Sequence, residues 1–145
     1  MSSITNSPSS EQVAQVARLA ARLILECGGE TYRAEDTAYR IARTFGFEAD
    51  IIAFPTGLTM TVRKDEHVLS VIARVERNDT NMTKLDQVNT VSRALCSGQI
   101  TLDEALHRLE QIQHQKGLTH GKSVLYAGCS AAAFLSFSHR AHAVP

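Results

Sequence analysis

The sequence lacks any excess of one charge, because fifteen lysines and arginines balance fifteen aspartates and glutamates among its 145 residues. A chain with no basic excess has no bulk attraction for nucleic acid, although a local basic patch is still allowed. Cysteines are few as well. Three of them without C-x-x-C spacing argue against a disulfide framework and fit a reducing compartment. We expect Cys27, Cys96 and Cys129 to be small buried hydrophobes.

Long apolar runs and targeting signals are also missing. The polar start, MSSITNSPSSE, has neither the charged start nor the apolar core of a signal peptide, so we expect residues 1–11 to form a flexible tail. The one membrane-like run, residues 124–137, is shorter than the roughly 20 residues that a spanning helix needs. It is followed by the polar sequence SHRAHAVP.

No standard catalytic or nucleotide-binding motif is present, because the sequence has no P-loop, G-x-G-x-x-G, G-x-S-x-G or H-E-x-x-H. His107 and His114 are seven positions apart, which places them about 10 Å apart along a helix. That is too far for one metal ion without a third element. We therefore expect solvated surface histidines, and neither a metal nor a cofactor.

Hydrophobic residues make up 43% of the chain, enough for one domain with a real core. Residues 12–27 carry one apolar stripe at helical spacing, with Arg18, Arg22 and Glu26 on the remaining face and an Arg22–Glu26 pair. Gly28 stands where a left-handed residue ends a helix. A second helix runs from Thr31, its expected cap, to Gly46. Glu35 and Asp36 are expected near its first turn, where the helix dipole favours negative charge.

The hydrophobic period then changes to two. DIIAF is a strand-like run, and residues 58–63 and 67–75 predict an antiparallel hairpin. Two further helices follow, each opened by an expected capping box, at residues 83–86 and 101–104. The predicted order is ααβββαα, an α+β fold in which helices pack on a small antiparallel sheet. We place the domain at residues 12–118.

Three polar segments stand out. The first, GGETYRAEDT, holds more charge than a helix corner needs, although capping, the helix dipole and a Tyr32 ring closing the corner account for part of it. The second, PTG, is typical of a turn or bulge, with Thr56 and the Gly57 N–H free for a ligand. The third places Asn89 and Arg93 at i and i+4 on one helix, and we expect Arg93 to face a carboxylate from the first segment. The candidate substrate-binding or gating residues are Glu30, Tyr32, Arg33, Glu35, Asp36, Thr37, Pro55, Thr56, Gly57, Asn89, Ser92 and Arg93.

In this order and spacing the three segments resemble the amino-terminal half of the threonine/serine exporter (ThrE) family, which shares the patterns G-x-E-T-Y-R-x-E-D-T, P-T-G and N-x-x-S-R. The resemblance covers roughly residues 15–137. It implies a bacterial inner-membrane protein in which a cytoplasmic domain precedes several transmembrane helices, and a second half or partner membrane protein adds more. Relatives export threonine and serine, a split pair is linked to succinate, and the proton gradient drives export.

Residues 122–138 resemble the start of the first membrane helix of the family, whereas residues 139–145 depart from the family pattern. The resemblance therefore implies a chain truncated in that helix and unable to transport alone. Its role in the intact protein would be gating, substrate capture or assembly. Arg33 or Arg93 would hold a carboxylate through two parallel hydrogen bonds, and Glu30 or Asp36 would take an ammonium group.

Two alternatives come from other classes of protein. A small hydrolase-like enzyme would use an acid of the first segment with Thr56 or Ser92, but no histidine lies within the three segments to act as base. A purely structural domain would dock on a membrane partner. Self-association into a homo-oligomer is a further option, and a small amino acid or carboxylate is the expected ligand.

Overall fold

The computed structural model describes residues 7–76 and 80–116. The chain divides into two units, residues 1–115 and residues 116–145, and all seven described elements belong to the first. Cys129, the expected membrane-helix start at residues 122–138 and the tail at 139–145 lie outside the described residues. Within the described ranges, no helix combines the length and the hydropathy needed to cross a membrane.

The element order is ααβββαα, which confirms the predicted α+β class. The elements are α1 (Ser10–Glu26), α2 (Thr31–Thr44), β1 (Glu48–Phe54), β2 (Gly57–Lys64), β3 (His67–Arg74), α3 (Met82–Cys96) and α4 (Leu102–His114).

The three strands form one antiparallel sheet in the order β1-β2-β3, and the predicted hairpin is its β2–β3 half. Leu58, Met60 and Val62 of β2 are buried, as their alternation predicts. This face of the sheet packs under the helices. The register sets Thr59 of β2 between Ile52 of β1 and Ile72 of β3 on the outer face.

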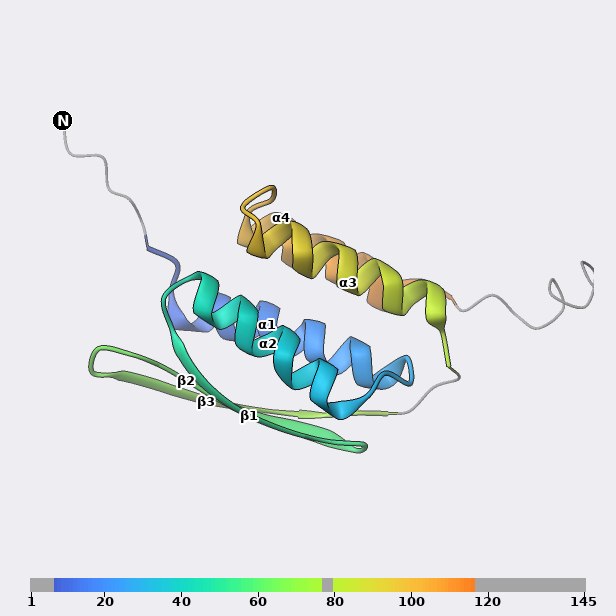
Figure 1. The fold of residues 1–145 in the computed structure, drawn as a ribbon, viewed down its shortest axis with the longest axis horizontal. Coiled ribbons are helices and arrows are strands. Elements are labelled where there is room, and N and C mark those ends of the chain that lie inside the picture. The colour runs from blue at the N-terminus through green and yellow to red at the C-terminus, as the bar shows by residue number, and fades with distance from the viewer. Residues whose placement is uncertain (1–6, 77–79, 117–145) are drawn as a thin grey trace, which may run out of the picture. The chain divides into compact units, whose positions relative to one another are not determined.

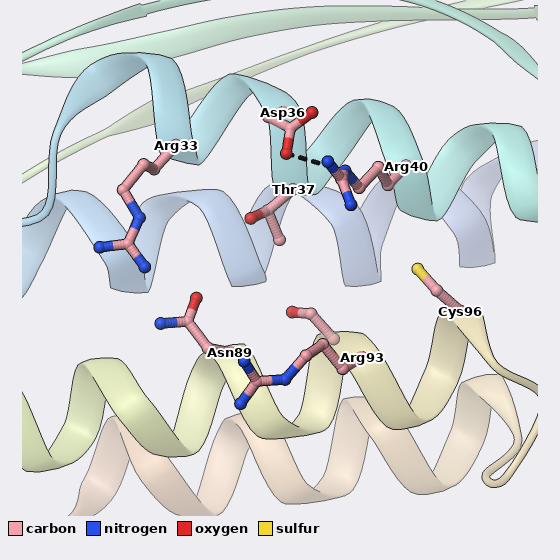
Figure 2. A pocket seen from close by; sticks show the side chains of 8 residues that line it. Arg33, Asp36, Thr37, Arg40, Asn89, Arg93 and Cys96 are labelled. Atoms are coloured by element: carbon pink, nitrogen blue, oxygen red, sulfur yellow. Dashed lines mark ion pairs between the residues drawn. The ribbon is translucent and has the colours of Figure 1, made fainter.

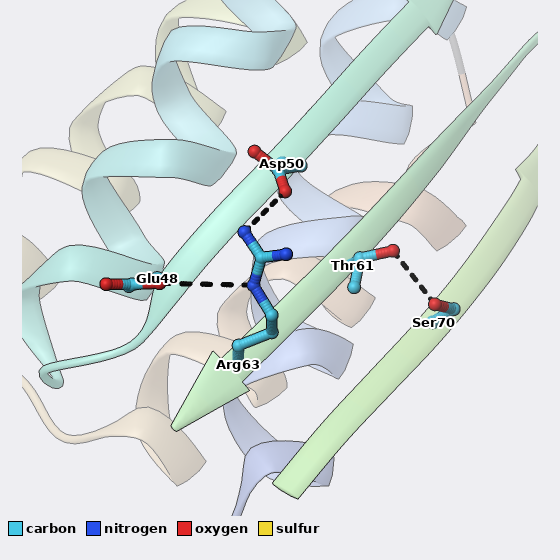
Figure 3. A network of polar contacts seen from close by, with 5 residues as sticks. All are labelled: Glu48, Asp50, Thr61, Arg63 and Ser70. Atoms are coloured by element: carbon cyan, nitrogen blue, oxygen red, sulfur yellow. Dashed lines mark hydrogen bonds and ion pairs between the residues drawn. The ribbon is translucent and has the colours of Figure 1, made fainter. Parts of the chain in front are cut away.

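The outer face of the sheet combines a polar end with an exposed apolar end. At the polar end, Arg63 donates to Asp50 at 2.8 Å and lies 3.9 Å from Glu48, while the hydroxyls of Thr61 and Ser70 are 2.8 Å apart (Figure 3). At the apolar end, three large side chains are more than half exposed: Ile52, Phe54 and Ile72.

The helices form two layers on the inner face of the sheet. α1 and α2 lie against the strands, and α3 and α4 cover the other side of α1 and α2 (Figure 1). α1 contacts α2, α3, α4, β2 and β3, so it is buried on almost every side rather than along the single stripe that the sequence suggested. Even Glu26 is buried there, where it accepts from Arg22 Nε at 2.6 Å, the predicted pair.

The helix N-termini differ most from expectation. α1 begins at Ser10, inside the segment expected to be a tail, because Ser9 and Gln12 form a capping box. The cap position of α2 is Glu30, whose side chain makes no capping bond, so Thr31 is the first helical residue and not the cap. Glu35 and Asp36 accordingly fall beyond the first turn of α2.

The cap of α3 is Asn81 rather than Thr83, since the Asn81 side chain accepts from the Lys84 N–H at 2.9 Å. α4 keeps half of its expected capping box. The Thr101 hydroxyl accepts from the Glu104 N–H at 3.2 Å, but the Glu104 carboxylate pairs with Arg108 on the next turn instead of returning to the cap.

Candidate functional site

α2 and α3 lie side by side, and each turns a polar stripe toward the other. On α2 the stripe runs through Arg33, Thr37 and Arg40, which are spaced i, i+4 and i+7. On α3 it runs through Asn89, Arg93 and Cys96 at the same spacing. Residues so spaced share one face of a helix, so the two packed helices set their polar faces opposite one another.

A cleft of about 280 Å³ lies between these two stripes (Figure 2). Its lining residues are Arg33, Asp36, Thr37, Arg40, Asn89, Ser92, Arg93 and Cys96. The first and third polar segments of the sequence therefore meet in space, although more than fifty positions separate Arg33 from Asn89.

The charges of the cleft are unequal. Asp36 is its only acidic lining residue among the described residues, and Asp36 Oδ2 lies 2.8 Å from Arg40 Nε on the same helix. Arg33 and Arg93 have no acidic partner within 4 Å in the described part of the chain. The nearest polar contact of Arg93 is a long one, from Nη2 to the Thr90 hydroxyl at 3.5 Å. Arg93 shares the cleft with the Asp36 carboxylate, but the two form no ion pair, because Asp36 pairs with Arg40 one turn along its own helix.

Ser92 contributes structure more than chemistry to the cleft. Its side chain is buried, and its hydroxyl donates to the Val88 carbonyl at 2.9 Å. This i−4 bond is the usual way in which a serine inside a helix satisfies its hydroxyl.

The PTG segment lies elsewhere. Pro55 lines a second small cavity with Glu30, Thr31 and the Gly28–Gly29 pair, where α1 ends and α2 begins. Neither Thr56 nor Gly57 lines the cleft. Of the three polar segments, only the first and the third contribute residues to the cleft.

The backbone of the β1–β2 turn explains the PTG residues locally. A Cβ on Gly57 would meet the Ala73 carbonyl oxygen at 2.8 Å, so only glycine fits between the strands there. The Thr56 carbonyl accepts from the Val75 N–H at 3.0 Å and ties the turn to the end of β3.

Glu35 and Tyr32 also lie outside the cleft. The Glu35 carboxylate accepts from the Ala53 N–H at 2.8 Å, which fastens α2 to the edge strand β1. Tyr32 is 63% exposed, so its ring does not close the helix corner. The first segment thus divides its residues between folding and the cleft.

Sequence reasoning missed two lining residues, Arg40 and Cys96. The spacing could have identified them, since Arg40 lies one helical turn beyond Asp36 and Cys96 lies one turn beyond Arg93. Neither residue belongs to the three polar segments.

The histidines form no ligand cluster in the described ranges. His107 and His114 are exposed on α4, and residues 7–76 and 80–116 contain no group of three potential ligands from histidine, cysteine, aspartate and glutamate.

Fold and cleft together define a small α+β domain with a cationic cleft between two packed helices. The sequence model of the ThrE family, described as "Putative threonine/serine exporter", matches residues 15–142. The chain therefore belongs to the ThrE family, as its motifs indicated, and is related to threonine/serine exporters. This is a family of transporters rather than of enzymes. No curated protein and no solved structure matches the chain.

Proposed function

We propose that residues 12–118 form the amino-terminal cytoplasmic domain of a bacterial inner-membrane exporter for threonine, serine or a dicarboxylate. In this proposal the domain works with a membrane half or partner membrane protein, and the α2–α3 cleft is where it engages the exported solute or the gate. Family membership supports the transport role.

One observation carries the role of the cleft. Arg33 and Arg93 come from motif segments far apart in the sequence, line the same cavity and have no acidic partner within 4 Å among the described residues. Both side chains are exposed, so neither guanidinium is fixed by the packing of the domain. Two unpaired arginines gathered in one cleft are available to an anionic ligand or partner group, which would accept the paired hydrogen bonds that a guanidinium donates.

The hydrolase alternative gains no support from the geometry. The Ser92 hydroxyl is buried and already donates to Val88, and Thr56 lies at the β1–β2 turn, away from the cleft. A nucleophile needs a base within hydrogen-bond reach, and no histidine of residues 7–76 and 80–116 lines the cleft.

The docking alternative has one observation in its favour, the exposed apolar end of the outer sheet face at Ile52, Phe54 and Ile72. Exposed apolar patches often mark surfaces that bind a partner. Docking and the proposed role of the cleft use opposite sides of the sheet–helix stack, so variants can separate them.

An export assay tests the proposal. Residues 1–118 replace the matching domain of a threonine exporter, and threonine efflux is measured from bacteria loaded with a threonine-containing dipeptide. Arg93→Ala and Asn89→Ala should lower efflux at least fivefold while the purified chain keeps its thermal midpoint. Arg63→Ala, on the outer sheet face, is the matched control and should export normally.

Three results would count against the cleft. If Arg93→Ala exports at the rate of the unchanged chimera, the cleft has no role in transport. If Arg93→Ala and Asn89→Ala unfold the domain, the third segment serves folding. If an Ile72→Lys variant alone abolishes efflux, the domain acts by docking.

A further inference from the structure

Resting on the proposed function of the same cleft, we propose that its ligand is a small dianion, a short dicarboxylate or inorganic phosphate, bridged between Arg33 of α2 and Arg93 of α3. A zwitterionic amino acid is the less favoured ligand. The charge balance of the cleft, its size and the positions of the two arginines all favour a dianion.

The charge balance excludes a good site for an ammonium group. Among the described residues, three arginines and one aspartate line the cleft, which leaves two positive charges in excess. The single carboxylate, Asp36, is taken by Arg40 at 2.8 Å. Glu30, the other acid expected to hold an ammonium group, lines the separate cavity beside Pro55. The ammonium group of a bound serine or threonine would therefore face arginines without a free carboxylate, and like charges at close range repel.

The placement of the arginines favours a bridging anion. Arg33 and Arg93 stand on facing helices, and their side chains extend along the two walls of the cleft (Figure 2). Guanidinium groups bind carboxylate and phosphate oxygens through paired hydrogen bonds, which is why arginine recurs at such sites. Thr37 and Asn89 add neutral hydrogen-bonding groups between them.

The size of the cleft suits a small ligand. Its volume of about 280 Å³ is close to the lower end of the range of ligand pockets, so a short dicarboxylate or a phosphate ion fits within it.

Binding to the purified 145-residue chain tests this proposal. Succinate, inorganic phosphate, serine and threonine are titrated separately at constant ionic strength, and affinities are taken from amide chemical-shift changes. We expect at least one of the two dianions to bind at least tenfold more tightly than either amino acid. Arg33→Gln and Arg93→Gln should each weaken that binding at least tenfold. Arg63→Gln on the sheet should not change it.

Two charge variants give a result that a purely structural role cannot produce. Asp36→Asn removes the negative charge of the cleft, so it should tighten dianion binding at least twofold. Arg40→Gln removes one positive charge and frees the Asp36 carboxylate. It should therefore weaken dianion binding and narrow the preference over serine and threonine.

The outcomes divide cleanly. Binding of succinate alone identifies a dicarboxylate site, binding of phosphate alone identifies a phosphate site, and both support the proposal. Serine or threonine binding as tightly as the dianions overturns it, and so does the absence of dianion binding. If the arginine variants fail to fold, the relative affinity of the unaltered chain for succinate and threonine still tests whether the ligand is a dianion. Efflux lost in Arg93→Ala without any dianion binding refutes this inference alone, whereas dianion binding together with normal efflux refutes the transport role of the cleft.

Discussion

We expect Glu35 to support the fold and not the cleft, and this role can be tested by a stability measurement. Its carboxylate accepts from the Ala53 N–H at 2.8 Å, and Ala53 lies on the edge strand β1 with its side chain buried. Glu35→Ala removes the acceptor and leaves this N–H unpaired at the contact between α2 and β1. A hydrogen bond to a charged group contributes about 1.5–3 kcal/mol. Because Glu35 is half-buried and water can partly replace it, we expect a loss of about 1–2 kcal/mol in the free energy of unfolding.

Urea denaturation followed by circular dichroism measures this loss, and each kcal/mol should lower the melting temperature by about 4–8 °C in a domain of this size. Glu35→Gln keeps an oxygen acceptor, so it should lose about half as much. Glu48→Ala is the matched control. Glu48 is also acidic, but it is exposed and 3.9 Å from Arg63, so its removal should change stability by about 0.5 kcal/mol or less. Equal midpoints for Glu35→Ala and Glu48→Ala would refute the reasoning.

Two further predictions concern the end of α1. Gly29→Ala should cost about 1–3 kcal/mol, because its Cβ would lie 2.5 Å from Ile24 Cγ2 and 2.7 Å from the Ile24 carbonyl oxygen. Gly98→Ala, at the end of α3, is the comparison. Its Cβ would meet no described atom within 4 Å, but its φ is +76°, so this variant should lose only about 1–2 kcal/mol through left-handed strain. If the denaturation midpoint of Gly29→Ala is higher than that of Gly98→Ala, the predicted clash with Ile24 is wrong. Burial raises the pKa of the Cys27 thiol, partly offset by Lys84 and reinforced by Glu26. The unfolded thiol releases its proton above about pH 8.5 while the folded one keeps it, so this contribution to stability is complete below that pH and is lost as pH rises toward the folded pKa. Cys27→Ala should flatten the decline in unfolding free energy between pH 8 and 10, and an unchanged slope would show that another group causes it.

Much of the fold was predictable because local patterns determine it. The alternation of Leu58, Met60 and Val62 with threonines predicts both the strand and its buried face, and the structure agrees. The caps of α2 and α3 were not predictable to the residue. Threonine, asparagine and serine all cap well, so choosing between Asn81 and Thr83 requires knowing where the chain turns into the helix.

The candidate site was predictable only in part, for a physical reason. Spacing along one helix shows which residues share a face, so Asn89 and Arg93 could be placed together from the sequence. Spacing does not show which helix packs against that face, or which basic residue pairs with a given carboxylate. Arg93 was expected to face an acid, but Asp36 has Arg40 one turn away on its own helix, and an i, i+4 pair needs no tertiary contact to form.

The GGETYRAEDT segment therefore divides into two groups whose variants should behave differently. Gly29 and Glu35 contact Ile24 and β1 and have no place in the cleft, so their variants should lose efflux only as far as they lose stability. Arg33 is exposed, lines the cleft and has no acidic partner within 4 Å in the described ranges, so Arg33→Gln should lose efflux at unchanged stability. Efflux plotted against unfolding free energy should place the first group on one falling line and Arg33→Gln well below it. If Arg33→Gln falls on the same line as the Gly29 and Glu35 variants, Arg33 affects efflux only through folding, and the cleft is not a functional site.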